Sequence, residues 1–173
     1  MRKFKIMFCD LDGTLIFKKN KESDSPWNFD INFKLLEKIK MMRPEYIFIV
    51  TNQSNVGKTV TEKEFEGKLD FVCACISYYI RNEFYAPKEV NGIYCQSDDL
   101  EEYYRKPNPG MLDVLCKTYK LLENFTKNDM IFIGDSSGKN SNSGIGDSDI
   151  KTAENFGIIY YDVNDFITIE NFR

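Results

Sequence analysis

The chain has 173 residues, of which 42% are hydrophobic and 29% charged, and its formal net charge is -4. This length and balance predict a single globular domain over residues 1–173, without a membrane-spanning run or a secretory signal. Histidine is absent, which excludes Ser-His and Cys-His hydrolases and most mononuclear zinc enzymes. Five cysteines, mostly in apolar segments, predict free thiols in a reducing compartment, either cytoplasmic or nuclear.

Apolar runs alternate with helical stripes along the chain. Residues near 4–9, 46–51, 91–96 and 130–134 are typical of buried strands, and 158–161 of a shorter last strand. The segments between them predict helices through apolar stripes at Phe33, Leu35, Leu36 and Ile39; at Phe65, Leu69, Val72, Cys73 and Ile76; at Met111, Leu112, Leu115 and Leu122; and over 149–156. This order predicts an α/β fold, a Rossmann-like doubly wound parallel sheet that binds ligands at the carboxyl ends of its strands.

Two carboxylates follow the first predicted strand. On an extended segment, Asp10 and Asp12 would share one face, and their repulsion is usually relieved by a cation or a shared proton. Taken alone, the segment could also be an aspartate-rich turn with Gly13 at its corner.

The rest of the chain decides between these two interpretations. The segment Asp10-Leu11-Asp12-Gly13-Thr14 resembles the first motif of haloacid dehalogenase-like (HAD) phosphohydrolases, and three further motifs follow in the right order. They are the strand 46–51 ending in Thr51, the segment Arg105-Lys106-Pro107, and the strand 131–134 followed by Asp135 and Asp149. The chain therefore resembles this superfamily over nearly its whole length, which implies the HAD-like core.

Within the superfamily, the chain is most similar to the 3'-phosphatase domain of polynucleotide kinase/phosphatases. The similarity is carried by Ser25-Pro26-Trp27, by Thr51-Asn52-Gln53 with Gly57-Lys58, by the stretch from Tyr104 to Asp113, and by the long polar loop between Gly134 and Asp149. Trp27 is interpreted as an ordinary core residue in preference to a base-stacking platform.

The resemblance implies a role for each motif. Asp10 would be the nucleophile and Asp12 the general acid and base, while Thr51 would hold the phosphoryl group and Lys106 would offset its charge. With no zinc-binding loop present, Mg²⁺ is the expected cofactor. Its ligands would be Asp10, the backbone carbonyl of Asp12, and Asp135. Asp149 would complete the site directly, through a water molecule or through Lys106. Asp147 is the alternative to Asp149. Substrate contacts are expected from Leu11, Gly13, Thr14, Asn52, Lys58, Arg105 and Lys139.

The substrate is predicted less directly. Intervals 15–45 and 53–104 leave no room for a separate lid, so we expect a capless enzyme whose open site suits a phosphate on a polymer end. The net charge provides no overall field for nucleic acid, and a basic rim would have to attract it: Lys18, Lys19, Lys21, Lys58, Arg105, Lys106 and Lys139.

Three functions remain open. The first is Mg²⁺-dependent removal of the 3'-phosphate from nucleic-acid ends, with DNA preferred to RNA, in DNA end repair and with a kinase or ligase as a conceivable partner. The second is a small-metabolite HAD phosphatase of the histidinol-phosphate or sugar-bisphosphate type. The third is a non-catalytic binding module. Both first-motif aspartates argue against the third, and the missing cap and zinc loop argue against the second.

Overall fold

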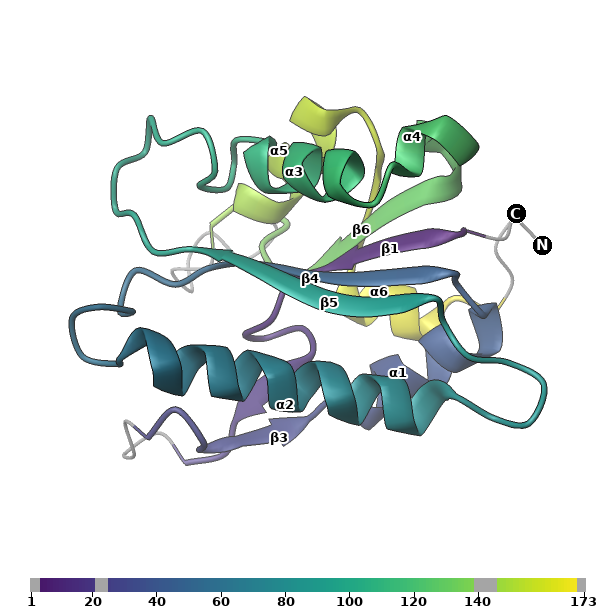
Figure 1. Ribbon diagram of the computed structural model, residues 1–173, viewed down its shortest axis with the longest axis horizontal. Coiled ribbons are helices and arrows are strands. Elements are labelled where there is room, and N and C mark those ends of the chain that lie inside the picture. Colours follow the sequence, from purple (N-terminus) through teal and green to yellow (C-terminus); the bar gives the residue numbers. More distant parts are fainter. Residues whose placement is uncertain (1–3, 21–24, 139–145, 171–173) are drawn as a thin grey trace.

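A five-stranded parallel sheet in the order β5-β4-β1-β6-β7 forms the centre of the computed structural model, which describes residues 4–20, 25–138 and 146–170 (Figure 1). Its strands are β1 (Ile6–Cys9), β4 (Tyr46–Asn52), β5 (Glu89–Cys95), β6 (Met130–Gly134) and β7 (Ile159–Asp162). The prediction of a Rossmann-like α/β fold is confirmed.

The central strand β1 determines where the motifs meet. All four of its residues are buried, and it pairs in parallel with β4 on one side and β6 on the other. Cys9 lies opposite Ile49 and Ile133 in these two pairings. Because the three strands end at the same edge of the sheet, the residues that follow them meet there.

Helices cover both faces of the sheet (Figure 1). On one face lie α1 (Phe33–Met42), α2 (Glu62–Ile80) and α6 (Val163–Thr168), and on the other α3 (Gly110–Thr118), α4 (Leu121–Asn124) and α5 (Ser148–Phe156), with a short 3-10 turn η1 (Lys127–Asp129) before β6. Each face has its own apolar core, because successive side chains of the strands point to opposite sides. Among the described residues, none of the helices combines the length and the apolarity that crossing a membrane requires.

Helix α2 is the longest helix and borders the functional edge. It begins with a capping box in which the Thr61 side chain accepts from the backbone N–H of Glu64 and the Glu64 carboxylate accepts from that of Thr61. Its buried stripe contains the expected Phe65 and Leu69, and also a lysine, Lys68, at the same helical spacing.

The interval between β1 and α1, for which no strand was predicted, contains two short strands. Strands β2 (Ile16–Lys18) and β3 (Phe29–Ile31) form an antiparallel hairpin. Each strand has three residues, too few for an alternating pattern to be recognised in the sequence. Within the described residues, the two intervals expected to lack a lid hold only this hairpin with α1, and α2 with β5.

Two side-chain predictions were wrong. Trp27 is 50% exposed and packs edge-on against Phe71 of α2, so it is not a core residue. The third predicted helix is interrupted after Thr118, where Lys120 adopts a left-handed conformation; the next turn therefore buries Leu121 and exposes Leu122.

Candidate active site

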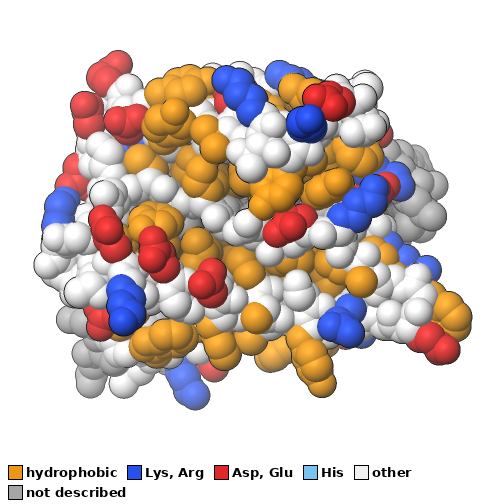
Figure 2. All heavy atoms as spheres, viewed as in Figure 1, with side chains coloured by type: hydrophobic (Ala, Val, Ile, Leu, Met, Phe, Trp, Pro, Cys, Tyr) orange, Lys and Arg blue, Asp and Glu red, His pale blue; other side chains and the backbone are white. Residues whose placement is uncertain are grey.

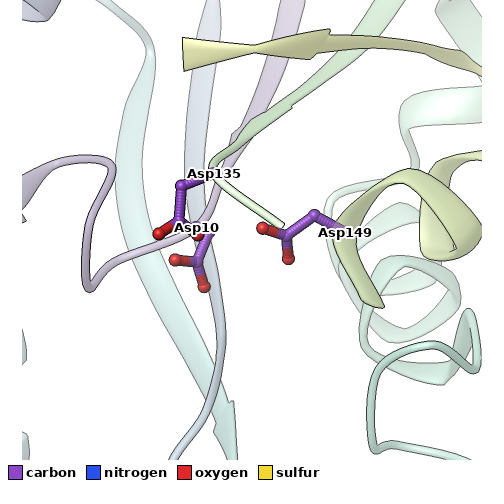
Figure 3. Close-up of side chains that lie close together, drawn as sticks. All are labelled: Asp10, Asp135 and Asp149. Atoms are coloured by element: carbon purple, nitrogen blue, oxygen red, sulfur yellow. The ribbon is translucent and has the colours of Figure 1, made fainter. Parts of the chain in front are cut away.

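Three carboxylates converge at the carboxyl edge of the sheet (Figure 3). Asp10 follows β1, Asp135 follows β6, and Asp149 lies in the first turn of α5. Each offers an oxygen within 4.8 Å of the oxygens offered by the other two. Clustered carboxylate oxygens are the ligands preferred by a hard cation such as Mg²⁺, so the donor set fits the expected cofactor.

Lys106 joins two of these carboxylates. Its Nζ lies 2.5 Å from Asp10 Oδ1 and 2.6 Å from Asp149 Oδ1, and the residue is only 4% exposed. Burial acts to lower the pKa of Lys106, but the two carboxylates outweigh it and raise that pKa above its usual value. Lys106 is therefore held as a buried cation.

The amide of Asn52 fixes the backbone of Lys106. Asn52 Nδ2 donates to the Lys106 carbonyl, and the Lys106 N–H donates to Asn52 Oδ1, both at 2.9 Å. Asn52, expected to contact substrate, thus positions the lysine as well as lining the site.

The electrostatics of the cluster leave it with excess negative charge. Burial raises the pKa of Asp10 to about 7, with Lys106 opposing and Asp149 adding to the rise. Burial also raises the pKa of Asp135, again with a contribution from Asp149. One lysine among three carboxylates does not balance the charge, and a bound cation would.

Two glycines make room for the carboxylates. Gly13 has φ +81°, and a Cβ on it would lie 2.1 Å from Asp135 Oδ2. A Cβ on Gly134 would lie 2.3 Å from Asp149 Oδ2. Gly13, expected to contact substrate, is therefore required for the close approach of Asp135.

Asp12 lies in the same cavity as Asp10 but has different partners. The chain turns after β1, where the N–H groups of Leu15 and Ile16 both donate to the Leu11 carbonyl, and both aspartates line one cavity, in line with the expectation that they point together. The Asp12 carboxylate is more than half exposed and accepts from Gln53 Nε2 at 2.6 Å. Its side chain is not part of the three-carboxylate cluster.

Gln53 links Asp12 to the end of β4. The same Nε2 lies 3.0 Å from Thr51 Oγ1, and Thr51 is buried. Asp12 and Thr51, though not Gln53, line a cavity of about 270 Å³. Its full lining is Asp10, Asp12, Thr51, Asn52, Lys106, Asp135, Ser136, Gly146 and Ser148. The structure thus places Asp10, Asp12, Thr51, Lys106 and Asp135 around one space.

The geometry separates Asp149 from its alternative, Asp147. Asp149 is buried, and its Oδ2 accepts from the backbone N–H of Ser136 at 3.1 Å. Asp147 is the N-cap residue of α5 and pairs with Lys151 at the surface, 2.6 Å away. Asp149 is the residue that joins the cluster.

The other described residues predicted to contact substrate do not line this cavity. Leu11 and Thr14 are buried in the turn, where the Thr14 carbonyl accepts from the Asn32 side chain. Arg105 donates to the Ser97 carbonyl, 2.5 Å from its Nη1. Lys58 forms an ion pair with Asp98 and does not line the cavity; Lys139 and the rim lysine Lys21 lie outside the described residues.

Sequence reasoning missed Gln53 and Lys68 as site residues. Lys68 Nζ lies 3.5 Å from Asp12 Oδ1, although the residue belongs to α2. The available signal was its helical spacing, because a lysine three residues after Phe65 and one before Leu69 falls on the buried stripe. A charged residue at such a position is rarely buried without a partner.

This sheet, with the aspartates, Thr51 and Lys106 at its carboxyl edge, defines a HAD-like phosphatase, a phosphoric monoester hydrolase. A family model described as polynucleotide kinase 3 phosphatase matches residues 5–167, and the chain belongs to that family.

Solved structures share the fold. One, from Mesorhizobium loti and assigned as a HAD-like phosphatase, is 18% identical over 90% of this chain and 69% of that chain, with a TM-score of 0.60. Another is D,D-heptose 1.7-bisphosphate phosphatase from B. bronchiseptica, complexed with magnesium and phosphate; it is 17% identical over 91% of this chain and 79% of that chain, with a TM-score of 0.64. No significant match was found among curated proteins.

Proposed function

We propose that this phosphatase is Mg²⁺-dependent and removes the 3'-phosphate from nucleic-acid ends, preferring DNA to RNA, through an aspartyl-phosphate on Asp10. The observation that carries the proposal is the placement of Asp10 and Asp12 on one cavity, in a chain whose family is described by this 3'-phosphatase activity.

The first chemical step would use Asp10 as the nucleophile. Lys106 contacts Oδ1, and the other carboxylate oxygen would attack phosphorus while the bond from phosphorus to the leaving oxygen breaks. Asp12, on the same cavity, would give its proton to that oxygen. The Thr51 hydroxyl would donate to the phosphoryl group, and the Lys106 ammonium would offset its charge.

The second step would return the enzyme to its starting state. A water molecule would attack phosphorus, Asp12 would take the proton from that water, and the bond to Asp10 would break to release inorganic phosphate. Splitting one displacement into two gives each carboxylate a separate task. Asp12 suits the proton transfers because it is exposed to solvent, whereas Asp10 is buried.

A cation would be held by Asp10, Asp135 and the backbone carbonyl of Asp12, with Asp149 attached through Lys106. When bound, Mg²⁺ would neutralise charge on the phosphate and on the carboxylates around it.

The test of substrate class is a panel assayed in Mg²⁺: a 3'-phosphorylated single-stranded oligonucleotide, its 5'-phosphorylated isomer, a 3'-mononucleotide, a sugar bisphosphate, histidinol phosphate and p-nitrophenyl phosphate. We expect kcat/KM at low salt to be at least about tenfold higher for the 3'-phosphorylated oligonucleotide than for the mononucleotide, because backbone phosphates add contacts that release counterions. This preference should shrink as salt rises. Acidic and basic side chains are mixed on the face shown in Figure 2, so the effect would arise from local contacts and not from the whole surface.

Equal efficiency on the oligonucleotide and the mononucleotide at low salt would contradict the proposal. Highest efficiency on the sugar bisphosphate or on histidinol phosphate would replace it with the small-metabolite function.

The replacement Asp12→Asn tests the proton transfers. We expect kcat for a 3'-phosphorylated oligonucleotide to fall about 10²–10⁴-fold, because the amide can neither protonate the leaving oxygen nor activate water. With p-nitrophenyl phosphate, whose leaving group needs no proton, a burst of about one equivalent of nitrophenol should precede slow turnover as the phospho-enzyme accumulates. A uniform loss on both substrates without a burst would contradict the assignment.

A further inference from the structure

A second hollow adjoins the 270 Å³ cavity that Asp10 and Asp12 line, which we call the phosphate cavity after the proposed function; the hollow lies on the side of Asp12. It has a volume of about 430 Å³, and a neighbouring hollow of about 510 Å³ shares most of its lining. We call the two together the hairpin groove; both are lined by Asp12, Lys18, Pro26, Asn55, Val60 and Lys68. Asp12 also lines the phosphate cavity, so the groove begins at the proposed acid.

The walls of the hairpin groove are already formed. The β2–β3 hairpin provides one wall and lies beside α2 (Figure 1). It is held there by Trp27 and Phe29, whose rings pack edge-on against Phe71 with centroids 5.9 and 6.3 Å away. The turn around Gly57, closed by a bridge between Val56 and Val60, provides the other wall.

Lys68 is a buried cation in this groove. It is 8% exposed, and its Nζ lies over the rings of Phe29 and Phe65, 5.4 and 5.8 Å from their centroids. Its hydrogen-bond acceptor among the described residues is Asp12 Oδ1, at 3.5 Å, which is the outer limit for such a contact. An ammonium group has three donors, and burial without good acceptors is costly. Donors of the Lys68 ammonium group therefore remain available for an anion from outside the chain.

We infer that the hairpin groove holds the leaving group, and that Lys68 binds the phosphodiester on the 5' side of the terminal nucleotide. The inference rests on the proposed function. Asp12 would protonate the leaving 3' oxygen, so the leaving sugar must lie on the Asp12 side of the cavity, where the groove begins. Beyond that sugar, the nearest negative charge of a nucleic acid is the diester at its 5' carbon. Lys68, whose ammonium group lies beside Asp12, is placed to contact this diester.

The test combines a change in the enzyme with a change in the substrate. Lys68→Met removes the charge and keeps an unbranched apolar stem between Phe29 and Phe65. The two substrates are 3'-phosphorylated dinucleotides whose internucleotide linkage is either the natural phosphodiester or an uncharged methylphosphonate. The coupling between the two changes isolates the contact, because effects on folding or on chemistry apply equally to both substrates.

We expect the parent enzyme to prefer the phosphodiester about tenfold to a hundredfold in kcat/KM, the size of a hydrogen bond to a charged group. Lys68→Met should reduce this preference to about threefold or less, and Lys68→Arg should retain most of it because the positive charge stays. For a longer single strand, the slope of log kcat/KM against log salt should also become shallower by about 0.7 in Lys68→Met, the value for one phosphate contact.

The matched control is Lys117→Met. Lys117 is an exposed lysine of α3, on the opposite face of the sheet. This control removes the same charge from the whole molecule and should keep the linkage preference and the salt slope of the parent.

Two results would overturn the subsite: no linkage preference in the parent enzyme, which requires no variant, or an undiminished preference in Lys68→Met. Failure of the proposed function looks different. The parent would then hydrolyse p-nitrophenyl phosphate but neither dinucleotide, whereas failure of the subsite alone leaves both dinucleotides as substrates.

Discussion

Asp10→Asn is expected to abolish turnover, with kcat reduced on the order of 10⁴-fold or more, as found when a catalytic nucleophile is removed. The amide keeps the shape of the side chain but cannot form the acyl phosphate. The measurement is release of inorganic phosphate from p-nitrophenyl phosphate and from a 3'-phosphorylated oligonucleotide. Both substrates should be affected equally, because both would react at the same carboxylate.

The fold should survive this change. Burial raises the pKa of Asp10 to about 7, above the value of an unfolded chain, so the folded protein binds this proton more tightly than the unfolded chain does. The free energy of unfolding therefore falls as pH rises from about 4 to 7. Above pH 7 it stays at this lower value, because the folded state then contains the buried, ionised Asp10 carboxylate. Asn carries no charge, so we expect Asp10→Asn to melt at or above the parent temperature at pH 8 in EDTA.

The matched control for Asp10→Asn is Asp147→Asn, the same chemical change at the surface residue that pairs with Lys151. We expect it to retain activity within about threefold of the parent, since surface changes away from special features have small effects. Turnover by Asp10→Asn within tenfold of the parent would contradict its role as the nucleophile.

Removal of divalent cations is the second change with a large expected effect. We expect EDTA to abolish activity and Mg²⁺ to restore it, because three carboxylates with one lysine leave an excess of negative charge. Ca²⁺ should bind without supporting turnover, since it is larger than Mg²⁺ and accepts looser, bidentate coordination that would engage both oxygens of the nucleophile. Full activity in EDTA would refute the metal site.

Asp135→Ala locates the cation. We expect the Mg²⁺ concentration for half-maximal activity to rise at least about tenfold, by analogy with the loss of a group that holds a metal in place. Binding to the folded state also stabilises it, so millimolar Mg²⁺ should raise the melting temperature of the parent at pH 8 and raise that of Asp135→Ala much less. An unchanged Mg²⁺ requirement in this variant would remove Asp135 from the ligand set.

The amino-acid pattern was sufficient to predict the strands that bring the motifs together. β1, β4 and β6 are continuous apolar runs, and a buried parallel strand requires such a run because both of its faces are covered. Each run ends in a polar residue, namely Asp10, Thr51 with Asn52, or Asp135. Since parallel strands end at one edge, their order in the chain was enough to place these residues in one site.

Which neighbouring residues complete the site became clear only from the packing of the folded chain. Asp147 and Asp149 are equivalent in composition and differ by two positions, but only Asp149 points inward, toward Lys106. Lys68 could not be assigned, because its contact with Asp12 depends on how α2 packs across 56 positions of sequence.

The β2–β3 hairpin shows the same limit. Its three-residue strands are stabilised by Phe29 and Trp27 packing on α2, and not by any local pattern. Hydrophobic periodicity reports burial along one element. It does not report which other element packs against the buried side chains. In this protein, the packing of the β2–β3 hairpin against α2 forms the hairpin groove beside Asp12.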